Sequence, residues 1–320
     1  MYSIDSTNAI IEFSFAGLQR EILRWQKRFP LVAQQPIGTS VLGQPLHLFK
    51  IGTGNVHIHL SAAMHANEWL TAYALVEYGM LLSERWDFCL SGKMDNHQSG
   101  RWKSFFSTFS VWFTPLVNPD GVQLVMDGHL DDIERYIAVL AMNNRSLEFS
   151  GWKANIRGVD LNDQFPAGWE SERERRSKET EVCGEKYAPG PRDFCGEKPL
   201  SEPEAVALVS LAEQQSFAMV IAFHSQGEEI YYNYCDLEPT ISMKMATRME
   251  LASGYRAVKL SDSDAGFKDW FIQQFGRPGF TVELGSGANP LPVDQLASMS
   301  EKIEHIVTAV TESWTTFCAE

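Results

Sequence analysis

Positive charge is scarce in this chain. Lysine and arginine number 27 against 41 aspartates and glutamates, which gives a formal net charge of −14 at pH 7. Such an excess of acid opposes binding to nucleic-acid phosphates and to anionic membrane surfaces. We therefore expect neither a nucleic acid nor a membrane among the partners, and no obligate protein partner is evident.

Long apolar runs and a cysteine framework are also missing. Nowhere do about 18 apolar residues follow one another, as a transmembrane helix requires. The opening MYSIDSTNAIIEFSF has no basic start and no small-residue cleavage site, so it is unlike a secretory signal. The five cysteines are scattered, and Cys183 and Cys195, which open two copies of CGEK, have no redox or metal spacing. These absences predict a cytoplasmic protein.

Strand-like and helix-like segments alternate along the chain. The 44% hydrophobic content can form one substantial core. The apolar spacing predicts helices at 8–30, 69–82, from Ser201 (with a capping box and Pro203 in the first turn), 239–253 and 292–317. Strand-like segments lie at 40–52 (a hairpin turning at Gly43–Gln44), 56–64, 110–122 (ending in an Asn-Pro-Asp-Gly turn), 218–224 and 279–285. This alternation predicts one α/β domain over 1–320, with a mixed, largely buried sheet and the helical segment 1–35 packed on it.

Residues 143–200 show little periodicity and many turn residues. Their charged run, 169–181, is expected to be a solvated surface segment.

Three potential metal ligands stand at strand ends. His65-x-x-Glu68 lies where a strand gives way to a helix, and His224 ends the apolar strand AMVIAFH. A catalytic zinc needs about three imidazole or carboxylate ligands and an open position, and strand ends are where α/β sheets build sites. Each piece alone is weak, since His224 could be a core histidine, but the three together favour a zinc site. His57 and His59 alternate within a strand and are interpreted as ordinary strand side chains.

Five segments resemble the zinc carboxypeptidase family of the carboxypeptidase A type: MHANEW (64–69), TPLVNPDGV (114–122), RGVDLND (157–163), FHSQG (223–227) and TVELG (281–285). The resemblance covers about residues 45 to 290. It implies a twisted eight-stranded mixed sheet between helices and one zinc ion held by His65, Glu68 and His224. It also implies Glu283 as general base.

A cation beside the metal is needed to stabilise the developing oxyanion. By position in WKANIRGVDLN, Arg157 best matches the family's oxyanion arginine, and Arg145 is the alternative. Either could instead be a surface arginine.

The sequence departs from the family where the substrate binds. Family members usually follow GVDLN with an arginine that clamps the substrate's C-terminal carboxylate, but Asp163 stands here, after the matching Asn162. Ser261 replaces the family's mobile tyrosine. Lys268, beside Asp269-Trp270, occupies the position that sets side-chain preference. An acid and a lysine predict a substrate with both an amine and a carboxylate.

Diaminopimelate of bacterial murein fits that description. The runs WKANIRGVDLNDQFPAGWE and YAPGPRDF resemble the γ-D-glutamyl-L-diamino acid endopeptidase branch of the family. That resemblance implies hydrolysis of the γ-D-glutamyl–meso-diaminopimelate bond. The alternatives are an ordinary metallocarboxypeptidase and a non-catalytic peptide-binding protein of the same fold.

Overall fold

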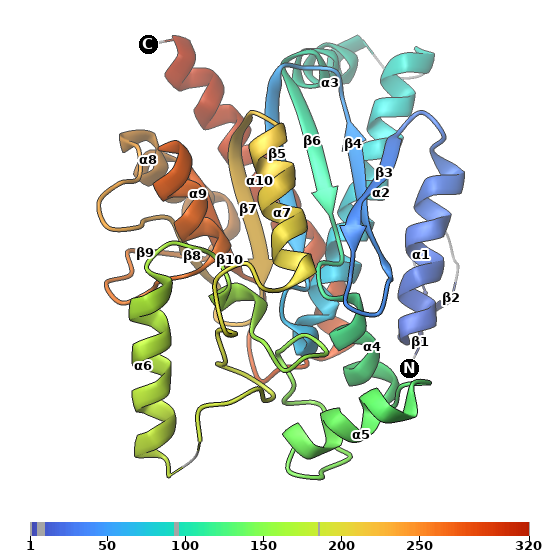
Figure 1. The fold of residues 1–320 in the computed structure, drawn as a ribbon. Helices are drawn as coiled ribbons and strands as arrows, with labels where there is room; N and C mark the ends of the chain where they lie inside the picture. Colours follow the sequence, from blue (N-terminus) through green and yellow to red (C-terminus); the bar gives the residue numbers. More distant parts are fainter. Residues whose placement is uncertain (1, 5–9, 93–95, 185, 320) are drawn as a thin grey trace.

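The computed structural model describes residues 2–4, 10–92, 96–184 and 186–319, and an eight-stranded sheet forms its centre (Figure 1). The strand order is β3-β4-β6-β5-β7-β10-β8-β9. The strands are β3 (Ala33–Thr39), β4 (Pro45–Ile51), β5 (Val56–Ala62), β6 (Phe109–Thr114), β7 (Phe217–His224), β8 (Glu229–Tyr231), β9 (Arg256–Val258) and β10 (Gly279–Glu283). The central strands β6, β5, β7 and β10 are parallel, and antiparallel neighbours flank them, so the expected mixed sheet is confirmed.

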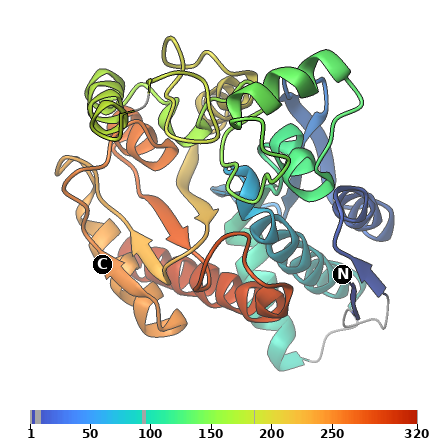
Figure 2. The same cartoon turned by 90° about the horizontal axis from the view of Figure 1, so that it is seen from below.

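Helices cover both faces of this sheet, and strand side chains alternate between the two layers. One core lies under α1 (Phe15–Arg28), α2 (Leu70–Ser91), α8 (Thr240–Ser253) and α10 (Leu296–Ala319). The other lies under α7 (Pro203–Gln214) and α9 (Phe267–Phe275). In β7, Ile221 faces the first core and Val220 the second. Figure 2 shows α2 and α10 side by side on the first face.

The N-terminal helix is anchored by an aromatic residue. α1 begins after Ser14, whose side chain accepts a hydrogen bond from the Gly17 N–H. Trp25 is fully buried, stacks on Phe49 of β4 with 4.0 Å between ring centroids, and donates to Ser83. α1 is shorter than the predicted 8–30, because β2 (Ile10–Glu12) precedes it and pairs with β1 (Tyr2–Ile4).

Several local predictions were wrong in detail. The hairpin turns at Gly43 as predicted, but its first strand is β3 before Ser40. The Asn-Pro-Asp-Gly segment begins α4 (Pro119–Asp127), because the Asn118 side chain caps that helix. Pro203 opens α7, yet Ser201 forms no capping box, because the N-cap is Glu202 and the Ser201 hydroxyl donates to Gln164 and Glu202. α3 (Asn96–Thr108) and α5 (Ile133–Met142) lie outside every predicted helix.

The charged run forms a helix, α6 (Trp169–Val182), and is not merely a solvated segment. In this helix Glu172 is buried and Arg176 forms an ion pair with Asp163, one of the predicted substrate residues.

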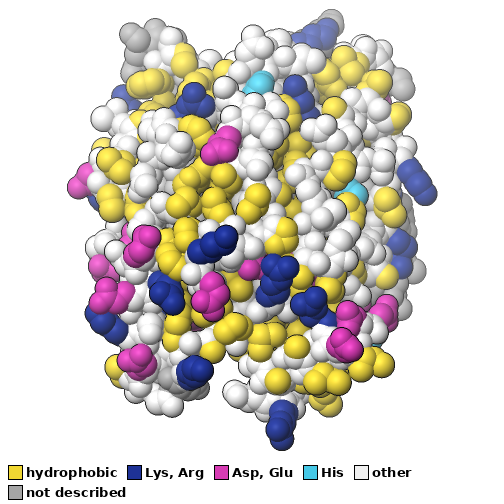
Figure 3. All heavy atoms as spheres, in the orientation of Figure 1, with side chains coloured by type: hydrophobic (Ala, Val, Ile, Leu, Met, Phe, Trp, Pro, Cys, Tyr) yellow, Lys and Arg dark blue, Asp and Glu magenta, His cyan; other side chains and the backbone are white. Residues whose placement is uncertain are grey.

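The face in Figure 3 carries basic and acidic side chains interspersed with apolar ones. Among the helices that the structure describes, none is long and apolar enough to cross a membrane.

Candidate metal centre

His65, Glu68 and His224 meet at the carboxyl ends of two adjacent parallel strands. His65 follows β5 and precedes the 3-10 turn η1 (Ala66–Glu68), which carries Glu68. His224 is the last residue of β7, which pairs with β5 in register. All three side chains are buried, and their ligand atoms lie within 4.8 Å of one another.

The donor atoms of this centre converge. His65 Nδ1 lies 2.8 Å from Glu68 Oε1, and His224 Nδ1 lies 3.0 Å from Glu68 Oε2. The two histidine Nδ1 atoms are only 3.2 Å apart. Two imidazole nitrogens and a carboxylate in this arrangement offer their lone pairs to one small region, and such nitrogen and oxygen donors suit Zn²⁺.

Asp160 holds the far side of the His65 ring, a role that the sequence analysis missed. The His65 Nε2 atom donates to Asp160 Oδ1 at 3.0 Å, which turns Nδ1 towards Glu68. Burial opposes a charge on the imidazole, but Glu68 and Asp160 raise the pKa of His65 to about 10. Asp160 belongs to the RGVDLND motif, so the motif itself was the signal for it.

Glu283 ends β10, beside His224. The two residues are register partners in neighbouring parallel strands, so both reach the same edge of the sheet. Burial and the Glu68 carboxylate raise the pKa of Glu283 to about 8, while His65 and Lys153 oppose this rise. Lys153 is thus close enough to act on both carboxyl groups.

Within the described ranges, the lysine or arginine that forms an ion pair with a metal ligand is Lys153, not either predicted arginine. Its Nζ lies 4.0 Å from Glu68 Oε1. Arg157 lies in a tight loop, closed by bonds of Asn155 N to Val159 O and of Gly158 N to Asn155 O. This loop directs the Arg157 guanidinium to Glu202, 3.4 Å away, and leaves the side chain 46% exposed.

Arg145 is exposed in the turn after α5. The structure therefore brings neither predicted arginine to the metal ligands. A basic residue in the same WKAN segment was the available signal for Lys153.

The predicted substrate residues fall into two groups. Asn162 and Asp163 lie in the 3-10 turn η2 (Leu161–Asp163), directly after Asp160. Asn162 is half-buried, whereas Asp163 is buried and its Oδ2 lies 3.1 Å from Arg176 Nε. Burial and Asp160 raise the pKa of Asp163 well above its usual range, against the effect of Arg176.

The second group comes from later in the chain: Lys268 lies in α9, and Ser261 lies in the segment before that helix. The Lys268 side chain is only 3% exposed, and its ammonium donates to the Asn233 carbonyl at 2.7 Å and to Asp269. It is therefore held by internal partners, contrary to the prediction of an open cation. Ser261 is exposed, donates to Asp262, and lines a surface cavity of about 510 Å³.

Comparison with protein families decides the classification. The zinc carboxypeptidase family model matches residues 22–315. The chain belongs to the zinc carboxypeptidase family. Gamma-D-glutamyl-L-diamino acid endopeptidase 1 of Lysinibacillus sphaericus is 41% identical over 293 residues, covering 91% of this chain and 70% of that protein.

Solved structures of the family share the fold. Bovine thrombin-activatable fibrinolysis inhibitor, in complex with tick carboxypeptidase inhibitor, has a TM-score of 0.69 at 18% identity and covers 95% of this chain and 97% of its own. Carboxypeptidase A from Helicoverpa armigera has a TM-score of 0.68 at 17% identity, over 96% of this chain and 74% of its own.

The chain belongs to a zinc-dependent family, and its candidate donor set fits the metal. Both histidines present Nδ1 to the Glu68 carboxylate, and Asp160 fixes the tautomer of His65. With His65 Nε2 donating to Asp160, a neutral His65 ring would point its Nδ1 lone pair at Glu68 Oε1, 2.8 Å away, and a bound cation removes this repulsion.

Proposed function

We propose that this chain is a one-zinc peptidase that hydrolyses the bond between γ-D-glutamate and the L-centre of meso-diaminopimelate in murein peptides. The observation that carries this proposal is Asp163. The family resemblance expects an arginine there to clamp a substrate's C-terminal carboxylate, and a buried acid cannot take that role. An endopeptidase needs no such clamp. The relative at 41% identity bears the name of a γ-D-glutamyl-L-diamino acid endopeptidase, which supports the same substrate.

The proposed chemistry divides among residues at the sheet edge. His65, Glu68 and His224 would hold the zinc, which when bound polarises the scissile carbonyl and acidifies water. Glu283 takes a proton from the attacking water and delivers it to the leaving amine, a role open to a carboxylate that ends its strand in register with His224.

Lys153 replaces Arg157 in this proposal as the cation for the developing oxyanion. Its ammonium lies 4.0 Å from a proposed metal ligand, whereas Arg157 pairs with Glu202. A fixed positive charge beside the reacting carbonyl stabilises the transition state more than the ground state. Asp160 positions the His65 ring without touching the substrate.

A pair of peptides tests the proposal. L-Ala-γ-D-Glu-meso-diaminopimelate is offered to the zinc-loaded protein, once with a free carboxylate at the L-centre and once with that carboxylate amidated. We expect both to be cleaved at the γ-glutamyl bond, with one zinc per chain by metal analysis and with activity abolished by Glu283→Gln. A strict need for the free carboxylate would instead establish an ordinary carboxypeptidase.

A further inference from the structure

α6 brings a guanidinium to Asp163. Arg176 Nε lies 3.1 Å from Asp163 Oδ2 and 2.8 Å from Glu172 Oε1, and Nη1 lies 3.0 Å from Asp193 Oδ1. The Arg176 side chain is 23% exposed, whereas that of Asp163 is 6% exposed. The arginine is therefore oriented by the buried Asp163 and Glu172 and by the half-exposed Asp193, and is still partly open to solvent.

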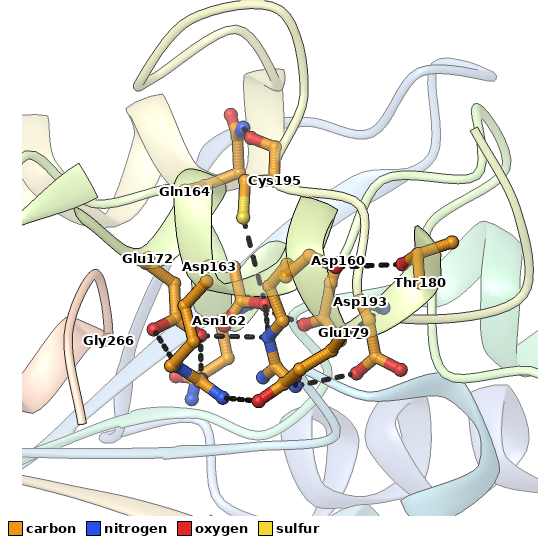
Figure 4. Close-up of polar contacts among 12 residues, drawn as sticks. Asp160, Asn162, Asp163, Gln164, Glu172, Glu179, Thr180, Asp193, Cys195 and Gly266 are labelled. Atoms are coloured by element: carbon orange, nitrogen blue, oxygen red, sulfur yellow. Dashed lines mark hydrogen bonds and ion pairs between the residues drawn. The ribbon is translucent and has the colours of Figure 1, made fainter. Parts of the chain in front are cut away.

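Acidic groups outnumber basic ones in this cluster, which Figure 4 shows around the labelled Asp163, Glu172 and Asp193. The neighbouring Arg175 is engaged by Glu172 and by Glu179. Burial and the neighbouring Asp160 raise the pKa of Asp163, and a further cation beside it would relieve this unfavourable accumulation of acidic groups. At the same time, Arg176 Nη2 makes no hydrogen bond to any residue in the described ranges, so it can donate to an incoming acceptor.

The cluster lies one short turn from the metal centre. Asp163 and Asp160 belong to the same turn, joined by the bond from Asp163 N to Asp160 O, and Asp160 holds His65. Asp163 is therefore connected to the metal centre through Asp160, which bonds both to the Asp163 N–H and to the His65 ring. Lys268, the other predicted cation, already donates to Asn233 and Asp269.

We propose that Asp163 and Arg176 together bind the head group of an amino acid, the ammonium at Asp163 and the carboxylate at Arg176. This inference rests on the proposed function, because the D-centre of meso-diaminopimelate is such a head group. The carboxylate-binding arginine is thus supplied by α6 and not by the position after Asn162. Arg176 is a specificity residue here, and Glu172 and Asp193 are positioning residues that fix its plane.

Three peptides separate the two halves of this site. They share L-Ala-γ-D-Glu and end in meso-diaminopimelate, in L-lysine, which lacks the distal carboxylate, or in L-2-aminopimelate, which lacks the distal amine. For Arg176→Gln we expect kcat/KM to fall about 10- to 100-fold on the diaminopimelate and aminopimelate peptides and by no more than about threefold on the lysine peptide. For Asp163→Asn we expect the comparable loss on the two peptides that carry the amine.

Arg175→Gln is the matched control, because Arg175 shares Glu172 with Arg176 but has no ion pair with Asp163. This control variant should change kcat/KM by the same small factor on all three peptides. Arg176→Lys, which keeps the charge, should restore part of the preference for the distal carboxylate. Unfolding curves of each variant establish that it is folded.

Equal losses of kcat/KM on all three peptides for Arg176→Gln would mean that the arginine only stabilises the position of α6. That result would overturn this inference but not the proposed function. A wild-type protein that cleaves none of the three would overturn the proposed function, and this inference with it.

Discussion

Replacing Lys153 with methionine removes the ammonium that lies 4.0 Å from Glu68 Oε1 but keeps much of the side chain's length. Two unit charges at that separation interact by about 1 kcal/mol in water and about 4 kcal/mol at an effective dielectric of about 20. The Lys153 side chain is 29% exposed, so the interaction lies between these limits. Loss of one donor to a developing oxyanion costs about 2.7 kcal/mol, or about 100-fold in kcat, at the lower end of known cases.

The assay is steady-state hydrolysis of L-Ala-γ-D-Glu-meso-diaminopimelate with zinc content measured on the same samples. For Lys153→Met we expect kcat to fall about 100-fold with KM changed little, and for Lys153→Arg much of the rate to return. Arg157→Gln is the control, because Arg157 pairs with Glu202 away from the ligands. An unchanged kcat for Lys153→Met at full zinc content, or an equal loss for Arg157→Gln, would refute the oxyanion role of Lys153.

Three further perturbations probe the metal centre and the buried acids. Asp160→Asn should weaken zinc binding about 10- to 100-fold, because His65 loses the carboxylate that orients it; competition with a chelating dye measures this, and unchanged affinity would exclude the positioning role. Removing the metal with a chelator should abolish hydrolysis, and added zinc should restore it; activity that survives complete removal would contradict a zinc mechanism. Burial raises the pKa of Glu204 to about 7 from its usual 4.5, so the native state binds this proton more tightly and stability falls as pH rises through that window. Glu204→Gln should remove up to about 3 kcal/mol of the decrease in the free energy of unfolding between pH 5 and pH 8, as measured by urea unfolding. An unchanged pH dependence in this variant would contradict the assignment to Glu204.

The residues of the metal centre could be predicted from the sequence mainly because they lie at the ends of strands. His65 and His224 could be placed together because each follows an apolar strand, and parallel strands end at one edge of a sheet. Glu283 was assigned from the family resemblance, and the structure places it in register with His224. These positions depend on short-range pattern and on topology, which the sequence expresses well.

Side-chain direction in irregular or highly charged segments was harder to predict. The run 169–181 has charged residues all around its helix, so no apolar periodicity marked it as a helix or Arg176 as facing inward. The direction of Arg157 depends on one tight loop, and that of Lys268 on the Asn233 carbonyl, 35 positions away in the chain. Such contacts come from tertiary packing, and local propensity does not encode them.

The most direct test of the proposed activity is the digestion of L-Ala-γ-D-Glu-meso-diaminopimelyl-D-Ala, with fragments identified by mass. The absence of a carboxylate-clamping arginine at Asp163 predicts cleavage inside the peptide, which yields L-Ala-D-Glu and diaminopimelyl-D-Ala. Release of D-alanine alone, with the γ-glutamyl bond intact, would contradict the endopeptidase account and establish a carboxypeptidase in its place.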